Sequence, residues 1–550
     1  MLLGLPPELI QLVLQHSTTP TYIQLAFSCR TLFEIASTCR EVILLHLRRT
    51  PGLDLDVKSS PTRDLFRLLV KRSIRQLYGA QYYATRKVFA AEGLAIDARA
   101  SAFATSGNPN LALVYKGESV RIFHAHNGNI SPVCCLKPPW RQPGRVEVLK
   151  TAFDRGNGIY VLQRFTPSID EGNVDEEQHP FVKHALQSGS NPIVYLAHHG
   201  IEAPDDGVRV CAFPEHTDYV PLGLGAADRD TFAISWQHAR DSGQTEVVLY
   251  TILQESTDEE SGIISFSYKS RVLLEESGEQ PDVDGALTVS SARSGLSDSK
   301  GPVIDLAFND RNSQLLYYYR GWTLYGSFQK INTSSDLTQP TLHRNSCTVH
   351  FSDSLSLRFS IAIPFFGTHQ TYSANNLSMC HWKYLSFGIA RQREENWTVA
   401  CILKSEARCR TRHCGHELNL DRGRRLSDWT IVGLLRGYQD PTSSLGCIVA
   451  ASARGTRLAI ANWNMIYVWA LEPNALIEEN KSGFYPPYFQ SANMDMIELQ
   501  SIILHLDAVC FKLIFTDKED ELLAITDRGV MYWDLGPSGK GEQMTYKLDL

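Results

Sequence analysis

Two stretches near the C-terminus, GTRLAIANWNMIYVW (residues 455–469) and EDELLAITDRGVMYWD (residues 519–534), follow one plan. Each has an apolar run, a short polar turn and a second apolar run that ends at or beside a tryptophan. β-Branched and aromatic residues that alternate with turn residues in this way are typical of β-hairpins. The sequence therefore predicts an antiparallel hairpin as the repeating unit of this chain.

Looser copies of this unit occur upstream. Two are clear at 111–123 and 315–325, and further units are expected at 158–165, 232–250 and 385–403. The seven units run from position 111 to position 523, with an average spacing of about 69 residues. A compact WD-type blade needs only roughly 40–45 residues. The units must therefore be separated by long loops.

A series of hairpins has strand edges that must be protected, and radial closure into a propeller protects them. We therefore predict a mainly β fold, a seven-bladed β-propeller over 81–550, preceded by a small all-α module and a linker helix. The segment 232–250 and the Trp533-Asp534 ending resemble degenerate WD repeats. A β-sandwich array or two β domains is the alternative architecture.

Residues 1–40 predict three short helices instead of strands. The pair Pro6-Pro7 marks a helix start with Glu8 at its positive end. The turn-forming stretch 17–21 interrupts the apolar pattern, and a second apolar stripe then continues to Ala36. A unit this small buries too little apolar surface to be stable alone, so its apolar face meets either a partner or the rest of the chain.

The order of residues in this N-terminal segment resembles the F-box. That resemblance implies docking to a Skp-type adaptor, and through it membership of a cullin-RING ubiquitin ligase. The residues that match the family pattern, and that we expect to form the docking face, are Leu5, Pro6, Leu9, Ile10, Val13, Leu14, Leu25 and Cys29. Some of them must instead hold the three helices together. The alternative is a helical cap packed on the following domain.

Residues 41–80 are expected to form linker helices. The clearest helix starts at 60–64, where Ser60 is a candidate hydroxyl cap and Pro61 fits the first turn, and it ends by Gly79. One face of this helix is apolar. The other face is expected to be solvated or to bind an anion, and it carries Arg63, Arg67, Lys71, Arg72 and Arg75.

Two insertions, near 169–180 and 255–300, are rich in acidic and small polar residues and are expected to be loops, with strand indicated only at 263–266 and 272–274 in the second. A third stretch is basic, and its guanidinium groups could bind a phosphorylated or acidic target. Those arginines are Arg410, Arg412, Arg422, Arg424 and Arg425. The segment 409–416 also holds two cysteines and two histidines, but their spacing matches no common zinc arrangement. We expect a surface loop without metal there.

Composition bounds the class of protein. The chain has 550 residues, a formal net charge of −7 and 12 irregularly spaced cysteines. This charge gives no indication of binding to nucleic acid or an anionic membrane. No apolar run is long enough to span a bilayer, so we expect an intracellular protein, cytoplasmic or nuclear, with reduced cysteines.

The strong short motifs for nucleotide, zinc-peptidase or hydrolase chemistry are absent from the sequence. We therefore expect no cofactor and no catalytic residue, and we predict a substrate-recognition adaptor that binds a target protein through its β body. One alternative is a propeller enzyme acting on sugars or lactones, with candidate carboxylates at Asp97, Asp154, Asp305 and Asp310. Another is an F-box scaffold that never joins a ligase.

Overall fold

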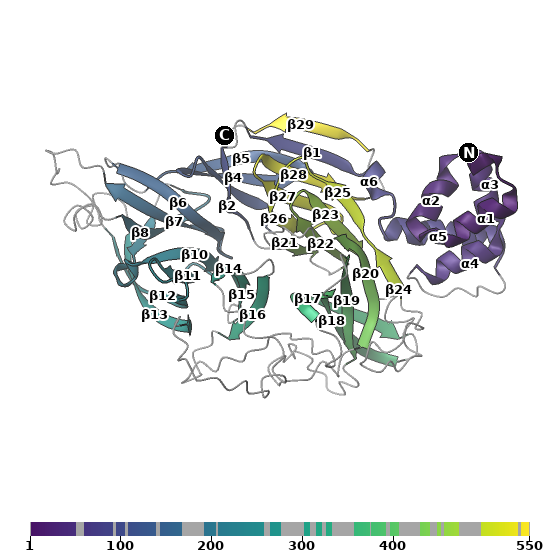
Figure 1. Cartoon of the computed structure of the whole chain (residues 1–550). Coiled ribbons are helices and arrows are strands. Elements are labelled where there is room, and N and C mark those ends of the chain that lie inside the picture. Colours follow the sequence, from purple (N-terminus) through teal and green to yellow (C-terminus); the bar gives the residue numbers. More distant parts are fainter. Residues whose placement is uncertain are drawn as a thin grey trace.

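The structure is a computed structural model of the whole chain. The residues that it describes are 2–50, 60–91, 95–104, 108–138, 144–167, 192–204, 207–257, 264–276, 302–308, 315–321, 326–332, 357–373, 376–391, 396–405, 430–439, 448–452, 456–471, 497–536 and 541–548. They form a small helical module followed by a large β body, as Figure 1 shows.

Five α-helices make up the helical module. They follow a 3-10 turn, η1 (Leu2–Gly4), and are α1 (Pro7–His16), α2 (Thr19–Ser28), α3 (Arg30–Thr38), α4 (Arg40–Arg48) and α5 (Thr62–Arg75). Pro7 opens α1 as expected, and the Thr18 side chain caps α2 by accepting a hydrogen bond from the Thr21 amide. The cap of α5 is Pro61, whereas the Ser60 carbonyl accepts a bond from Arg40.

The expected division at residue 40 does not separate two packing units. Leu65, Phe66 and Leu69 of α5 share one buried cluster with Ile10 and Leu14 of α1. Helices α4 and α5 therefore complete the core of the module instead of linking it to the next domain. Three helices alone would bury too little apolar surface, and α4 and α5 supply the remainder.

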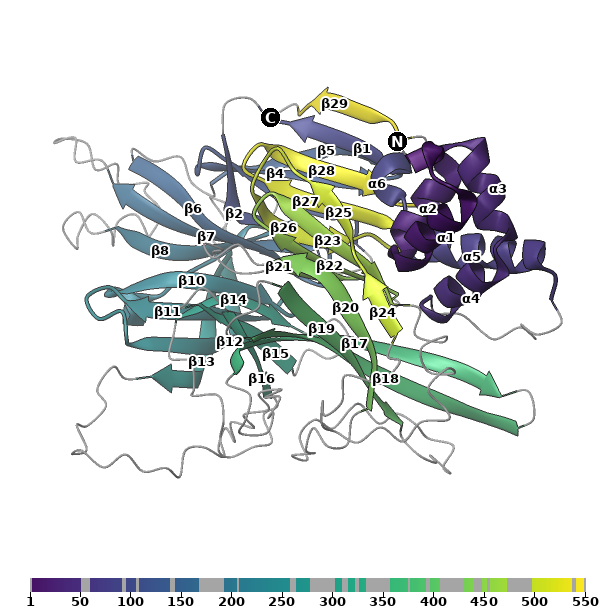
Figure 2. The ribbon, with the colours of Figure 1, turned by 45° about the vertical axis from the view of Figure 1, so that its right-hand side comes forward.

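A short connection joins the module to the β body. After α5 the chain turns through Leu77 and Gly79, both with positive φ, into α6 (Ala80–Tyr83). Leu77 and Ala80 are buried among side chains of the C-terminal sheets. The helices stand beside the β body in both views (Figures 1 and 2).

The described strands form six sheets. The first sheet holds β2 (Ile96–Phe103), β3 (Asn110–Tyr115), β4 (Ser119–His126) and β5 (Asn129–Leu136). The second sheet has eight strands, which are β6 (Gly144–Phe153), β7 (Gly158–Pro167), β8 (Ile193–Gly200), β9 (Arg209–Ala212), β10 (Tyr219–Ala226), β11 (Thr231–His238), β12 (Thr245–Thr257) and β13 (Ile264–Glu276). The third sheet holds β14 (Val303–Phe308), β15 (Leu315–Gly321) and β16 (Gly326–Asn332). The fourth sheet holds β17 (Leu357–Ser373), β18 (Asn376–Arg391), β19 (Asn396–Ser405), β20 (Thr430–Gln439) and β24 (Ile497–Gln500).

The last two sheets hold β21 (Ile448–Ala451), β22 (Arg457–Asn462), β23 (Met465–Ala470) and β25 (Ile502–His505), then β26 (Cys510–Phe515), β27 (Glu521–Thr526), β28 (Gly529–Asp534), β1 (Thr85–Ala90) and β29 (Gln543–Lys547). A 3-10 turn, η3 (Pro214–His216), precedes β10. Across the described sheets, most neighbouring strands are antiparallel and consecutive in the chain.

Neighbouring sheets contact one another in chain order. β2 contacts β6, and β10, which belongs to the same sheet as β6, contacts β6 and β14. β16 then contacts β17, β20 contacts β23, and β21 contacts β26. β26 contacts β2 again, and Lys512 of β26 pairs with Asp305 of β14 at 3.4 Å. The last sheet includes β1, which comes from the start of the β body and pairs antiparallel with β28. Sheets that follow one another in this way, with both ends of the body in one sheet, form a propeller-like arrangement.

Three details differ from the sequence expectation. The segment 158–165 is not a hairpin but lies within one strand, β7, which pairs with β6 and β8. In the acidic stretch from 255, β12 runs to Thr257, and one continuous strand, β13, covers both short runs that were expected to be strand. β13 also pairs in parallel with β9, and this joins eight strands into one sheet. The number of blades stays a prediction. The insertion near 169–180 lies outside the described residues.

Candidate functional site

The helical module holds α1 rigidly from its inner side. His46 of α4 lies 3.0 Å from the Leu14 carbonyl and 3.2 Å from the Thr19 hydroxyl, and its ring stacks on Tyr22 at 4.3 Å. The Tyr22 hydroxyl donates to the Ala36 carbonyl at 2.8 Å. These buried bonds join α1, α2, α3 and α4, so the outer face of α1 is presented on a fixed support.

Arg72 stabilises the same module from α5. Its guanidinium donates to the carbonyls of Leu47 and Thr50, at 3.2 and 3.0 Å, at the end of α4. The last carbonyls of a helix lack partners within the helix, and a buried arginine satisfies them here. Arg72 is thus buried, and the expectation that it belongs to the outer basic face of α5 is wrong.

The outer face of α1 is apolar and exposed. Its exposed large apolar side chains are Leu9 (45% exposed), Leu12 (48%) and Val13 (41%), and Leu5 (38%) is exposed just before the helix begins at Pro7. A helix turns by 100° per residue, so Leu9, Leu12 and Val13 share one side while Ile10 and Leu14 point to the other. We call Leu5, Leu9, Leu12 and Val13 the α1 face. An exposed apolar row on a rigid support is typical of a protein-docking surface.

The residues expected on the docking face divide into three groups. Leu5, Pro6, Leu9 and Val13 are exposed, whereas Ile10 and Leu14 are buried in the core of the module. Leu25 and Cys29 are half-buried and pack against that core. Leu12 was missed by the sequence reasoning, although its position three residues after Leu9 could have indicated it. The basic loop with Arg410, Arg412, Arg422, Arg424 and Arg425 lies outside the described residues, as does the segment 409–416.

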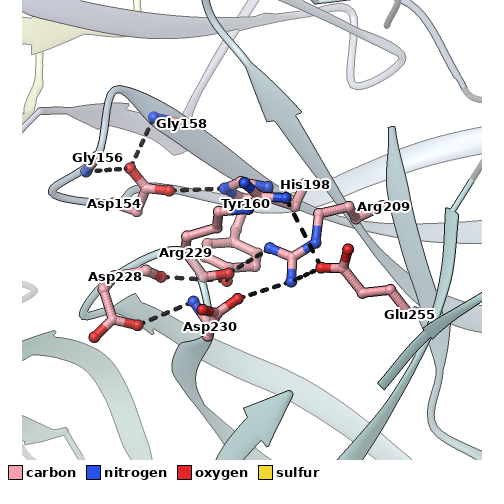
Figure 3. Close-up of polar contacts among 10 residues, drawn as sticks. All are labelled: Asp154, Gly156, Gly158, Tyr160, His198, Arg209, Asp228, Arg229, Asp230 and Glu255. Atoms are coloured by element: carbon pink, nitrogen blue, oxygen red, sulfur yellow. Dashed lines mark hydrogen bonds and ion pairs between the residues drawn. The ribbon is translucent and has the colours of Figure 1, made fainter. Parts of the chain in front are cut away.

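A buried polar cluster lies in the eight-stranded sheet (Figure 3). The Asp154 carboxylate accepts hydrogen bonds from the Gly156 and Gly158 amides and pairs with His198, each at 2.7 Å. Burial alone would raise the pKa of Asp154, but the hydrogen bonds from His198 and from these two amides lower it below its usual value. This carboxylate is therefore held in its ionised form.

The second half of the cluster centres on Arg209 of β9. Its guanidinium donates to the Arg229 carbonyl at 2.6 Å and pairs with Asp230 at 2.8 Å and Glu255 at 2.5 Å. The Tyr160 hydroxyl donates to the same carbonyl, and burial raises the pKa of Tyr160 far above neutral pH. Figure 3 shows these groups bonded to one another across β7, β9, the β10–β11 turn and β12. The cluster ties the two halves of the eight-stranded sheet together, which is a structural role.

The carboxylates considered for a propeller enzyme have similar local partners. Asp97 accepts bonds from the amides of Arg99 and Ala100, and Asp305 pairs with Lys512. Asp310 lies outside the described residues. Among the residues that the structure describes, no cluster of three histidine, cysteine or carboxylate side chains could hold a metal ion.

The β body also has a cleft at its closing seam. It has a volume of about 140 Å³ and lies between the sheet of β2–β5 and the sheet of β26–β28, with Phe103 and Phe515 in its lining. Lys518 crosses the seam to Asn127 at 2.7 Å and pairs with Glu521 at 2.8 Å.

No family model matches the chain, and no curated protein matches it. Among solved structures, the chain is similar to the C-terminal WD40 domain of Sif2, at 11% identity, 82% of this chain, 94% of that chain and a TM-score of 0.28. It is also similar to Saccharomyces cerevisiae Sqt1, at 11% identity, 82% of this chain, 86% of that chain and a TM-score of 0.35. Both scores are below 0.5, so the propeller-like description rests on the strand order and the contacts between sheets. In the described part of the chain, no helix has the length and apolarity to cross a membrane.

Proposed function

We propose that this chain is a non-catalytic substrate-recognition adaptor of a cullin-RING ubiquitin ligase. Its α1 face binds a Skp-type adaptor, and its β body binds the protein to be modified. The observation that carries the proposal is the α1 face itself, where four apolar side chains are exposed in the presence of the whole β body.

The arrangement of the module supports this role. Ile10 and Leu14 hold α1 to the other helices, which leaves Leu5, Leu9 and Val13 available to a partner. The alternative of a helical cap sealed under the following domain requires these side chains to be buried, and they are exposed. The resemblance of residues 1–40 to the F-box supports a Skp-type adaptor as the partner that binds this face.

In the proposed mechanism, the chain promotes the reaction only by positioning the target protein. A target bound to the β body and an adaptor bound to α1 are parts of one complex, so the target lysine meets the ubiquitin-loaded enzyme at a high effective concentration. This mechanism requires no catalytic side chain in this chain.

The test is binding of a purified Skp-type adaptor to the full chain with Leu9→Asp and Val13→Asp together. Both positions are exposed, so the helices should stay folded, whereas a change at Leu14 would disrupt the core. We expect adaptor affinity to fall by about tenfold or more, because a desolvated interface would bury two carboxylates without partners. Isothermal titration calorimetry measures the affinity, and circular dichroism at 222 nm checks the helices.

Leu253→Asp is the matched control. Leu253 is an exposed leucine on β12 in the β body, and its change should leave adaptor affinity unchanged. Equal adaptor binding by the α1 double variant and the control would exclude α1 as the docking face. Adaptor binding without any cullin in complexes isolated from cells would instead favour the ligase-independent scaffold.

A further inference from the structure

A row of positively charged side chains runs along α5 and is separate from the α1 face. Arg63, Arg67, Lys71 and Arg75 are exposed and follow one another at four-residue intervals. A helix rises by 1.5 Å per residue, so neighbouring cations are about 6 Å apart along the axis and the row is about 18 Å long. Arg67 pairs with Asp64 at 3.3 Å, and both side chains are largely exposed. Such an exposed pair is weak, and the row stays strongly positive.

Apolar side chains adjoin this row. Ile74 of α5 is 40% exposed, and it lies three residues after Lys71 on the same side of the helix. Two phenylalanines of α2 and α3, Phe27 (57% exposed) and Phe33 (39%), lie against Phe66 of α5, with ring centroids 6.3 and 5.5 Å away. We call the row of four cations, Ile74, Phe27 and Phe33 together the α5 ridge.

We propose that the α5 ridge is a second docking surface, which binds an acidic amphipathic helix of a partner protein. A partner helix with carboxylates at four-residue spacing places them at the same interval of about 6 Å as the cations of α5. Its leucine or phenylalanine side chains would cover Ile74, Phe27 and Phe33. This combination of charge complementarity with a few apolar anchors gives fast association and a fixed orientation.

The chemistry of the ridge favours a protein over a nucleic acid. Ile74 is aliphatic and lies beside the cations, where a nucleic acid would place phosphates and sugars. A phosphate backbone would leave this side chain in contact with polar groups, whereas an amphipathic helix would bury it. The formal charge of the whole chain is −7, so the positive potential is local to α5.

The probe for the test is a fluorescein-labelled helical peptide of about 18 residues, with glutamates at four-residue spacing and leucines beside them. Fluorescence anisotropy measures its binding to the full chain at low and at high salt. We expect Arg63→Ala, Arg67→Ala and Lys71→Ala together to weaken binding by about tenfold at low salt, and salt to weaken parent binding similarly. Ile74→Ser should weaken binding about threefold at both salt concentrations, because it removes apolar contact without changing charge.

Lys137→Ala, Arg240→Ala and Lys269→Ala together are the charge-matched control, since these cations are exposed on the β body. This control and the α1 double variant should both bind the peptide like the parent chain, so the two docking surfaces are tested separately. The proposal is overturned if the triple α5 variant binds as the control does. It is also overturned if a peptide with serine in place of leucine binds equally well, or if a single-stranded RNA of similar length binds more tightly.

Discussion

His46 couples the fold of the helical module to pH at the scale of a single residue. Burial lowers its pKa to about 4, with a smaller lowering effect from Arg49, while the hydrogen bond to the Leu14 carbonyl acts in the opposite direction. In the unfolded chain the His46 side chain takes up a proton near pH 6.5, whereas in the folded module it takes up this proton only near pH 4. The contribution of neutral, buried His46 to the unfolding free energy is therefore fully present above about pH 6.5, and it is lost as the pH decreases towards 4.

We expect the helical module to lose about 3 kcal/mol of unfolding free energy between pH 6.5 and pH 4 through His46. The measurement is thermal unfolding followed by circular dichroism at 222 nm across this pH range. His46→Gln should lower stability at pH 7 and flatten the pH dependence, whereas His16→Gln, at an exposed position of α1, should leave the slope unchanged. A slope that survives His46→Gln would assign the effect to another group.

At the scale of elements, Gly529 allows β1 to approach β28 closely in the last sheet. Gly529 has φ of +139° and pairs with Ala90 at the end of the β28–β1 ladder. A Cβ at this position would overlap the backbone carbonyl of Phe89. The absence of a side chain is thus what allows the two strands to approach at this end.

Gly529→Ala should destabilise the β body by about 3 kcal/mol, because it adds both backbone strain and a clash. Gly117→Ala in the β3–β4 turn is the matched control, since Gly117 also has a positive φ but an added Cβ would meet no atom within 4 Å. That control should cost about 1 kcal/mol. Hydrogen–deuterium exchange of β1 and β28 should increase in the first variant alone, and equal exchange in the two would contradict this account.

At the scale of the whole molecule, β1 joins the start of the body to its end. It lies between β28 and β29 in the C-terminal sheet, although the helical module directly precedes it in the chain. Without β1 the last sheet would expose the edges of β28 and β29. Exposed strand edges are sites of aggregation.

Removal of residues 1–75 should leave a folded β body, because Leu77, Ala80 and β1 remain in place. Removal of residues 1–91 should give a protein that aggregates or unfolds at a much lower temperature, because the closing strand is lost. Size-exclusion chromatography and calorimetry of the two shortened chains provide the comparison. Equal thermal stability of both would show that the body does not depend on closure by β1.

Much of the local structure could be predicted from short-range patterns. The proline pair at the start of α1 fixes a helix start because proline fits only the first turn. The hairpins at 455–469 and 519–534 follow from alternating apolar residues around short polar turns, and they are β22–β23 and β27–β28 in the structure. These features depend on residues that are neighbours in the chain.

The docking face could be predicted only in part. Leu9 and Ile10 are adjacent apolar residues, and their side chains alone do not say which of them faces solvent. That choice depends on the packing of α1 against α2, α3 and α4, which buries Ile10 and Leu14. The packing of α5 on α4 buries Arg72, whose charge had suggested an outer position.

The sequence by itself determined the mainly β class, the helical N-terminus and the hairpins β3–β4, β22–β23 and β27–β28, because each follows from periodicity within a few residues. Only the tertiary structure decided that β9 and β13 join into one sheet, that β1 closes the last sheet, and that Asp154 meets His198. These pairs are far apart in the chain. Their meeting depends on the packing of whole sheets, which no local pattern of side chains records.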